Sequence, residues 1–200
     1  MRIVLASSNS GKIAEFKAYL EGYEVLSYGE IMKPFEIEEY GKSFKENAII
    51  KSRAVFQRLN DKNAVVLSDD SGISVPLLGG IPGIYSARFA GKDANAQKNL
   101  QLLVQKLKET GVEKTGAFYT AAIAISTDKG DFSVHGWMHG EAVTNPKGSN
   151  GFGYDPMFIP RGFDKTLGEL PKSVKEQFSH RSRALKLALI LLKTLIKDKK

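Results

Sequence analysis

The chain has 200 residues, 42% hydrophobic and 26% charged, a composition typical of one soluble globular domain. Its apolar runs are too short to span a bilayer, and the lack of cysteine excludes disulfides and thiol catalysis and fits a reducing cytoplasm. The formal net charge of +7 suits a polyanionic ligand, although part of that excess lies in the lysines of the last four residues.

The N-terminal segment has the pattern of a strand, a polar turn and a helix. The apolar pattern of residues 2–6 predicts a buried strand, and this segment is too short for a signal peptide. Small polar side chains fill residues 7–12, and apolar residues then recur at helical spacing. Backbone N–H groups at such a helix N-terminus attract phosphate, although the spacing is not that of a Walker A loop. In a purely structural alternative, Asn9 caps the helix and Lys12 is exposed.

A second strand, an acidic loop and a second helix are expected next. The strand is predicted over residues 23–27. The acidic cluster at 36–39 would by default be solvated surface. Ser43 and Glu46 have the spacing of a capping box, which predicts a helix from this point to about Leu59.

The most informative stretch is residues 65–75, where an apolar run rich in β-branched side chains predicts a buried strand. The run stops at two adjacent carboxylates, Asp69 and Asp70, followed by Ser71 and Gly72. In open α/β sheets, ligands bind where strands end at a crevice. Two neighbouring carboxylates repel each other, and Mg²⁺ would relieve the repulsion because it takes oxygen ligands. Asp, Ser and Gly also favour turns, so a simple turn is the alternative.

The middle of the chain predicts a loop, a third helix and a hairpin. Residues 78–88 are rich in Gly and Pro, which lets the backbone approach a ligand or a partner closely. Asp93 is expected to cap a helix whose core face extends to Leu107. Strands are predicted at 116–127 and 131–143, joined by a tight turn.

The C-terminal part combines a second glycine-rich loop with a cationic helix start. Residues 148–156 carry Phe152 and Tyr154, whose rings could stack on a nucleobase or pack within their own turn. His180 and Arg181 lie at the N-terminus of the last predicted helix, where the helix dipole disfavours cations. This local conflict indicates a functional reason for their position.

Taken together, these segments resemble the inosine triphosphate pyrophosphatase family, also called the dITP/XTP diphosphatases. The matching segments keep the family order and cover nearly the whole chain, at residues 7–12, 44–48, 68–72, 79–88, 151–156 and 179–181. The chain departs from many relatives at Ser7, where they carry Thr. Both side chains have a hydroxyl, so this difference puts little in doubt.

The resemblance implies hydrolysis of purine nucleoside triphosphates with deaminated bases to the monophosphate and pyrophosphate, using Mg²⁺. It also implies an α/β fold with a long mixed sheet flanked by helices, in a single two-lobed domain over residues 1–200 with a central cleft. The implied partner is a second copy of the chain, with no nucleic acid polymer and no membrane.

Site residues follow from the resemblance one motif at a time. The residues that it implies at the triphosphate are Ser7, Ser8, Asn9, Ser10, Gly11 and Lys12, with Lys51 as a helper. The metal ligands that it implies are Glu39 and Asp70, of which Asp70 is also the catalytic carboxylate. The remaining substrate contacts that it implies are Ser71, Phe152, Gly153, Tyr154, Asp155, Lys175, His180 and Arg181. Whether Asp70 acts as a base or only as a metal ligand stays open.

The chemistry of these side chains is consistent with the implied substrate. Lys175 and Arg181 offer only hydrogen-bond donors, and His180 offers at least one. Donors match the acceptor oxygen at position 6 of hypoxanthine and xanthine and oppose the amino group of adenine.

Two other functions compete with this interpretation. The basic charge and the glycine-aromatic loop would also suit a nucleotide- or RNA-binding module without catalysis. The Asp69-Asp70 pair and the acidic segment 36–39 argue against such a module, because acids repel phosphates unless a metal intervenes. A pyrophosphatase for modified or pyrimidine nucleotides, as in the Maf-like proteins, is the second alternative, and a substrate panel would separate the two enzymes.

Overall fold

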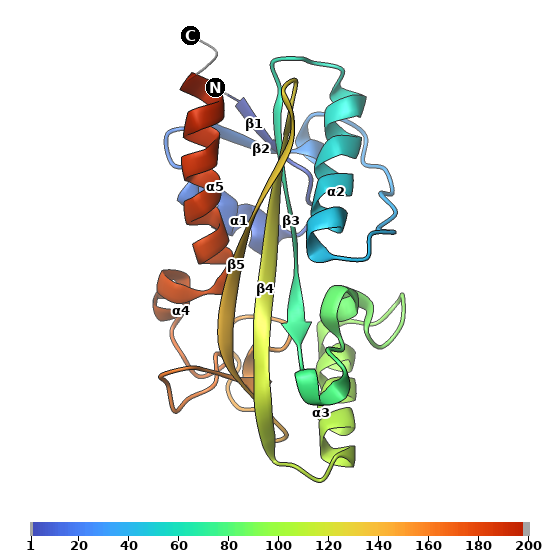
Figure 1. Ribbon diagram of the computed structural model, residues 1–200, viewed down its shortest axis with the longest axis vertical. Coiled ribbons are helices and arrows are strands. Elements are labelled where there is room, and N and C mark those ends of the chain that lie inside the picture. The colour runs from blue at the N-terminus through green and yellow to red at the C-terminus, as the bar shows by residue number, and fades with distance from the viewer. Residues whose placement is uncertain (1, 198–200) are drawn as a thin grey trace. The chain divides into compact units, whose positions relative to one another are not determined.

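A computed structural model describes residues 2–197 of the chain. The elements in chain order are β1 (Arg2–Leu5), α1 (Ser10–Tyr19), β2 (Glu24–Ser27), α2 (Phe44–Leu59), β3 (Val65–Ser74), α3 (Ala96–Glu109), β4 (Lys114–Thr127), β5 (Gly130–Val143), β6 (Phe158–Pro160), α4 (Lys172–Phe178) and α5 (His180–Lys197). Short 3₁₀ helices lie in the connections (Figure 1). No helix among the described residues is long and apolar enough to cross a membrane.

The strands form one mixed six-stranded sheet in the order β2-β1-β3-β4-β5-β6. β1 pairs in parallel with both β2 and β3, and β5 pairs antiparallel with β6. The parallel pairs need crossover connections, which α1 and α2 supply, whereas β4 and β5 are joined by a two-residue turn. The predicted α/β fold with a mixed sheet and flanking helices is therefore confirmed.

The chain divides into two compact units, which we describe separately. The first contains the chain up to Asp70, the segment Ala121–Gly136 and α5 from Arg183 onward. The second contains Ser71–Thr120 and Trp137–Ser182.

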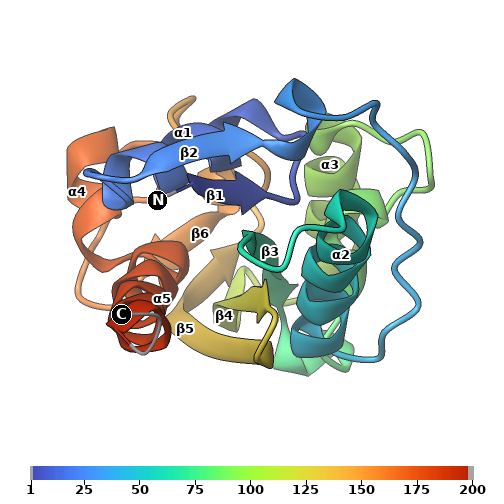
Figure 2. The ribbon, with the colours of Figure 1, turned by 90° about the horizontal axis from the view of Figure 1, so that it is seen from above.

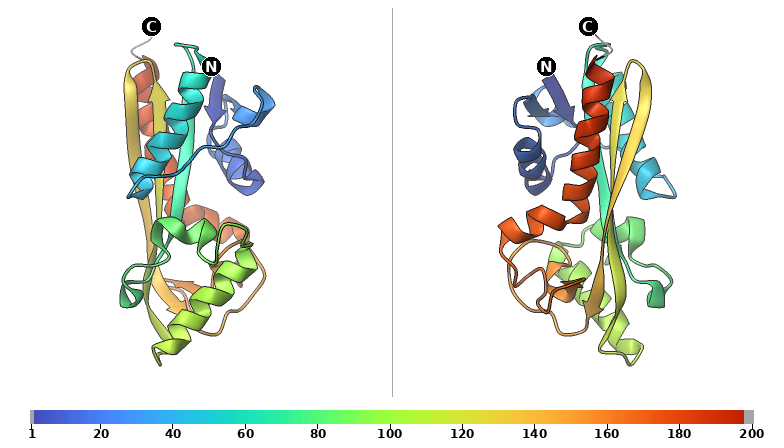
Figure 3. Two further views of the ribbon diagram at one scale, coloured as in Figure 1. Left: turned by 90° about the vertical axis from the view of Figure 1, so that its right-hand side faces the viewer. Right: turned by 60° about the vertical axis from the view of Figure 1, so that its left-hand side comes forward.

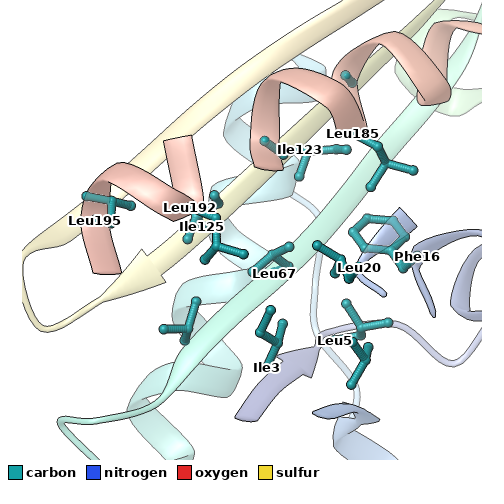
Figure 4. Close-up of a cluster of buried hydrophobic side chains, with 14 of the residues drawn as sticks. Ile3, Leu5, Phe16, Leu20, Leu67, Ile123, Ile125, Leu185, Leu192 and Leu195 are labelled. Carbon is teal, nitrogen blue, oxygen red and sulfur yellow. The ribbon is translucent and has the colours of Figure 1, made fainter. Parts of the chain in front are cut away.

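Helices cover both faces of the strands in the first unit. Alternate side chains of a strand point to opposite faces. Leu67 of β3 accordingly lies in a buried cluster with Phe16 of α1 and Leu185 of α5 (Figure 4). Its neighbour Val66 lies in another cluster, with Val55 of α2. Figures 2 and 3 show α5 and α2 on opposite sides of these strands.

The second unit has its own core. It is formed by α3, by β3 from Ser71, β4 up to Thr120 and β5 from Trp137, and by the segment around β6. Leu100, Leu103 and Leu107 form the predicted core face of α3 and are buried. They share a cluster with Met157 and Phe158. The apolar spacing in the sequence thus identified the buried face of α3 correctly.

Two predicted helix caps differ from the structure. Asn95, not Asp93, caps α3, and its side chain accepts a hydrogen bond from Lys98 N at 2.9 Å. At α2, Ser43 Oγ accepts from Glu46 N at 3.2 Å as expected. The Glu46 carboxylate, however, accepts from Lys42 N at 2.6 Å instead of completing the predicted capping box.

Candidate active site

Asp69 and Asp70 lie inside β3, and the expectation that the strand ends at these residues is wrong. The strand continues through Ser71 and Gly72 to Ser74, so the alternative of a simple turn is also excluded. Hydrogen bonding to neighbouring strands outweighs the local turn preference of these residue types. Because successive side chains alternate, Asp69 points to the α1 side of the sheet and Asp70 to the α2 side.

On the α2 side, Asp70 forms a charged group with Lys51 and Glu39. Lys51 Nζ donates to Asp70 Oδ1 at 3.0 Å and to Glu39 Oε1 at 2.8 Å. Lys51 comes from the middle of α2, and Glu39 comes from the irregular segment that precedes this helix. All three side chains are largely shielded from solvent, with 10–21% of each exposed. The structure therefore brings together three side chains that the sequence separates.

Burial and charge act against each other in this group. Burial raises the pKa of Asp70, and the nearby Glu39 carboxylate raises it further, while Lys51 opposes both effects. Burial alone would lower the pKa of Lys51, but the charges of Asp70 and Glu39 leave this pKa raised. Lys51 thus carries its positive charge, and Asp70 is a stronger proton acceptor than an exposed aspartate.

The donor atoms here fit a magnesium ion. Asp70 Oδ2 is buried and has no hydrogen-bond partner among residues 2–197. The described residues contain no group of three or more His, Cys, Asp or Glu side chains that could hold a metal. Mg²⁺ commonly binds through one or two carboxylates and completes its shell with waters and substrate phosphates. Glu39 and Asp70 would be the protein ligands.

On the α1 side, Asp69 pairs with Lys12. Lys12 Nζ lies 2.6 Å from Asp69 Oδ2 and 3.4 Å from the Asp69 carbonyl oxygen. Asn9 caps α1 by accepting from Lys12 N at 3.0 Å, as the structural alternative predicted, and Ser7 Oγ accepts from Asn9 N at 3.2 Å. Lys12 is not simply exposed, since only 18% of its side chain meets solvent. Residues 8–11 at the helix start are exposed and accessible to an anion.

In the second unit, Asp155 binds Lys175 and the turn that carries Phe152. Lys175 Nζ donates to Asp155 Oδ2 at 2.5 Å, and Phe152 N donates to the same oxygen at 2.9 Å. Gly151 leaves the space that this carboxylate fills, because a side chain there would collide with it. Phe152 is 45% exposed, and Lys175 Nζ lies 4.6 Å from the centroid of its ring. An exposed ring beside a cation is available for stacking on a base.

His180 and Arg181 occupy the first turn of α5, as predicted, and both are buried. Arg181 donates to Ser71 Oγ at 2.9 Å, and its guanidinium carbon lies 5.6 Å from the Phe152 ring centroid. The His180 ring stacks on Tyr119 with centroids 4.7 Å apart and 14° between the planes. Lys175, Arg181 and Ser71 therefore belong to one polar group around Phe152 and Asp155.

The structure revises the interpretation of Tyr154 and adds a second aromatic residue, Tyr119. Tyr154 is buried, and its hydroxyl donates to the Ser86 carbonyl at 2.7 Å, so Phe152 supplies the exposed ring. Tyr119 beneath His180 was missed, because one aromatic residue in a long strand is an ordinary core signal. Burial places the pKa of Tyr119 well above its ordinary value, so its phenol is neutral.

The chain matches the model of the Ham1 family over residues 3–190. Among curated proteins, it is 57% identical to the dITP/XTP pyrophosphatase of Nautilia profundicola, covering 98% of this chain and 99% of that one. It is 53% identical to the dITP/XTP pyrophosphatase of Sulfurimonas denitrificans, covering 98% and 100%. The structure is similar to the Staphylococcus aureus Ham1 protein, with a TM-score of 0.84, 39% identity and full coverage of both chains. A HAM1 protein from Coxiella burnetii gives a TM-score of 0.86 at 35% identity, with 97% and 99% covered.

These matches show that the chain belongs to the Ham1 family. They confirm the resemblance drawn from the motifs, since the relatives carry the name expected from it.

Proposed function

We propose that this protein hydrolyses deaminated purine nucleoside triphosphates, ITP, dITP and XTP, to the monophosphate and pyrophosphate. The observation that carries the proposal is the group of Glu39, Lys51 and Asp70, in which two shielded carboxylates flank a cation. The names of the Nautilia and Sulfurimonas relatives support the choice of substrate.

The reacting end of the substrate is assigned to the first unit. Glu39 and Asp70 would hold Mg²⁺, which would supply positive charge against the phosphates and a Lewis acid for the attacking water. Lys12 and the exposed N–H groups at the start of α1 bind the triphosphate. Lys51 keeps its positive charge beside Asp70, where it stabilises negative charge that develops on the phosphate. We also assign to Asp70 the acceptance of a proton from the attacking water; Mg²⁺ bound to the same carboxylate would lower its pKa.

The base is assigned to the second unit. Phe152 stacks on the purine, and Lys175, His180 and Arg181 present donors to its acceptor oxygens. Buried donors that lack an acceptor oppose binding of the wrong base, which can give discrimination of roughly 10⁴-fold. Gly153 and Tyr154 contribute through the turn that holds Phe152. Both assignments belong to the single domain that the family resemblance implies.

Further parts of the proposal are a homodimer and a cytoplasmic location. Leu77 and Tyr85 expose about half of their side chains in the second unit, which supports a contact with another protein surface. A cytoplasmic location fits a substrate from the nucleotide pool.

The experiment that tests the function measures pyrophosphate release from ITP, dITP, XTP, ATP, GTP and a pyrimidine triphosphate. We expect rapid release from the first three substrates with Mg²⁺, slow release from ATP and GTP, and little distinction between ribose and deoxyribose. Chelation of the metal should abolish turnover. Binding of ITP without pyrophosphate release would identify a non-catalytic module, and preference for the pyrimidine would identify a different pyrophosphatase.

A further inference from the structure

The segment that carries Glu39 has no regular structure of its own. Residues 33–41 belong to no helix or strand. A carboxylate on such a segment keeps a defined position only if other contacts hold the backbone nearby. Before Glu39, Phe35 and Ile37 pack against the buried cluster that contains Tyr28 and Val55. After Glu39, the contacts come from the first turn of α2.

The backbone just after Glu39 is hydrogen-bonded to side chains of α2. Gly41 N donates to Asn47 Oδ1 at 2.8 Å, and Lys42 N donates to Glu46 Oε2 at 2.6 Å. Gly41 lies so close to this turn that a Cβ there would be 2.6 Å from Asn47 Oδ1. The two hydrogen bonds therefore anchor the segment two and three residues beyond Glu39.

Of the two anchoring side chains, Asn47 is the stronger candidate for control of Glu39. Its side chain is fully buried, whereas Glu46 is exposed to competing water. Asn47 and Lys51 are four residues apart and share one face of α2. The segment is thus held at two points on this face, at Gly41 by Asn47 and at Glu39 by Lys51.

We propose that Asn47 is a positioning residue that holds the Glu39 segment in place for binding of a divalent cation. The inference rests on the proposed function, because it takes Glu39 and Asp70 as the metal ligands. Partners that orient a metal ligand commonly change metal affinity by about 10- to 100-fold when they are removed. Asn47 acts on the cation only through Glu39, so its effect must depend on the Glu39 carboxylate.

The test titrates Mn²⁺, as a spectroscopic substitute for Mg²⁺, into the substrate-free protein and follows free Mn²⁺ by electron paramagnetic resonance. The Asn47→Ala variant should bind Mn²⁺ about 10-fold more weakly than the wild type. In a Glu39→Gln background, the same substitution should have almost no further effect, since coupled residues are not additive. The Asn47→Asp variant keeps an oxygen that accepts from Gly41 N, so it should lose much less Mn²⁺ affinity than Asn47→Ala.

Asn99 offers a matched control in the second unit. It is buried as the fourth residue of α3, as Asn47 is the fourth residue of α2, and its Oδ1 accepts from Ala90 N at 2.8 Å. The Asn99→Ala variant should lose stability without a change in Mn²⁺ affinity. If Asn47→Ala does not fold, Asn47→Ser tests the same contact, because its shorter side chain lacks the amide oxygen that accepts from Gly41 N.

The outcomes separate this inference from the proposed function. Unchanged Mn²⁺ affinity in Asn47→Ala, while Glu39→Gln binds weakly, would overturn the role of Asn47 alone. Equal losses from Asn47→Ala in the presence and absence of the Glu39 carboxylate would also overturn it. If Glu39→Gln and Asp70→Asn both bind Mn²⁺ as the wild type does, the assigned metal ligands are wrong and both proposals fall.

Discussion

Asp70 is the residue on which the proposed chemistry depends most. We expect the Asp70→Asn variant to fold and to lose at least about 100-fold in turnover of dITP, the lower range for a positioned acid–base group. The amide keeps the shape of the side chain but removes its negative charge and its capacity to accept a proton. Circular dichroism checks the fold, and steady-state kinetics check the loss.

Asp69 provides the comparison for that experiment. It lies on the opposite face of β3 and pairs with Lys12, so Asp69→Asn should reduce turnover less than Asp70→Asn does. A folded Asp70→Asn variant with near-wild-type turnover would place the site elsewhere.

Replacement of Lys12 tests whether this residue binds the triphosphate of the substrate. Lys12→Ala should raise KM for dITP, because the ammonium group meets phosphate charge in both the ground state and the transition state. Lys17 lies on the same helix, is 45% exposed and pairs with Glu30 at 3.8 Å, so Lys17→Ala serves as the control and should behave as the wild type. Unchanged KM and kcat in Lys12→Ala would remove this residue from the mechanism.

Arg181 tests the reading of the base. Arg181→Ala should lower kcat/KM for ITP much more than for ATP. The base of ITP has an acceptor oxygen at position 6 that loses its donor, whereas adenine has no such oxygen. Arg183, two residues further along α5, is exposed, and its replacement by Ala should leave the ITP-to-ATP ratio unchanged. The measurement is kcat/KM for both substrates in each variant. A constant ratio in Arg181→Ala would show that this residue does not read the base.

Among the elements, β3 depends on the loop that follows it. Ser86 Oγ accepts from Ile73 N at 3.1 Å and donates to Gly83 O at 2.6 Å, so the loop over 78–88 has a task within its own chain. The glycine and proline content of this loop indicates only a close approach to a ligand or a partner. A Cβ at Gly72 would lie 2.5 Å from Gly83 O and 2.8 Å from Ser86 Cβ. Glycine is therefore needed here for close packing.

A pair of strand glycines turns this observation into a stability prediction. Gly72→Ala should lower the free energy of unfolding by about 1–3 kcal/mol, as overpacking of a closely packed site does. Gly116 in β4 has nothing within 4 Å of an added Cβ, so Gly116→Ala should change stability little. Urea denaturation of both variants makes the comparison. Equal stability of the two would contradict the close contact at Gly72.

At the scale of the whole molecule, the proposed homodimer is open to direct measurement. Light scattering at micromolar protein should give twice the monomer mass. Tyr85→Lys should shift the population toward monomer if the exposed face of the second unit forms the contact. A single species of monomer mass in the wild type would contradict the dimer.

The sequence by itself determined most elements and the family. Local signals carry this information. Apolar periodicity predicted the buried face of α3 and the two strands of the β4–β5 hairpin. The spacing of Ser43 and Glu46 predicted the start of α2. The motifs in their order were enough for the family resemblance, which the similarity over residues 3–190 confirms. The predicted cap of α3 was wrong because two polar residues suited to capping, Asp93 and Asn95, lie within a few positions of each other.

Only the tertiary structure decided how the charged residues are paired. Asp69 and Asp70 are neighbours in sequence, yet their partners Lys12 and Lys51 lie 57 and 19 residues away on different helices. Strand alternation sends the two carboxylates to opposite faces, and this follows only once β3 is known to continue past them. Turn preference is a local property, whereas sheet pairing and burial depend on segments far apart in the chain. That is the physical reason why the family resemblance could name candidate site residues from the sequence, whereas their spatial arrangement needed the structure.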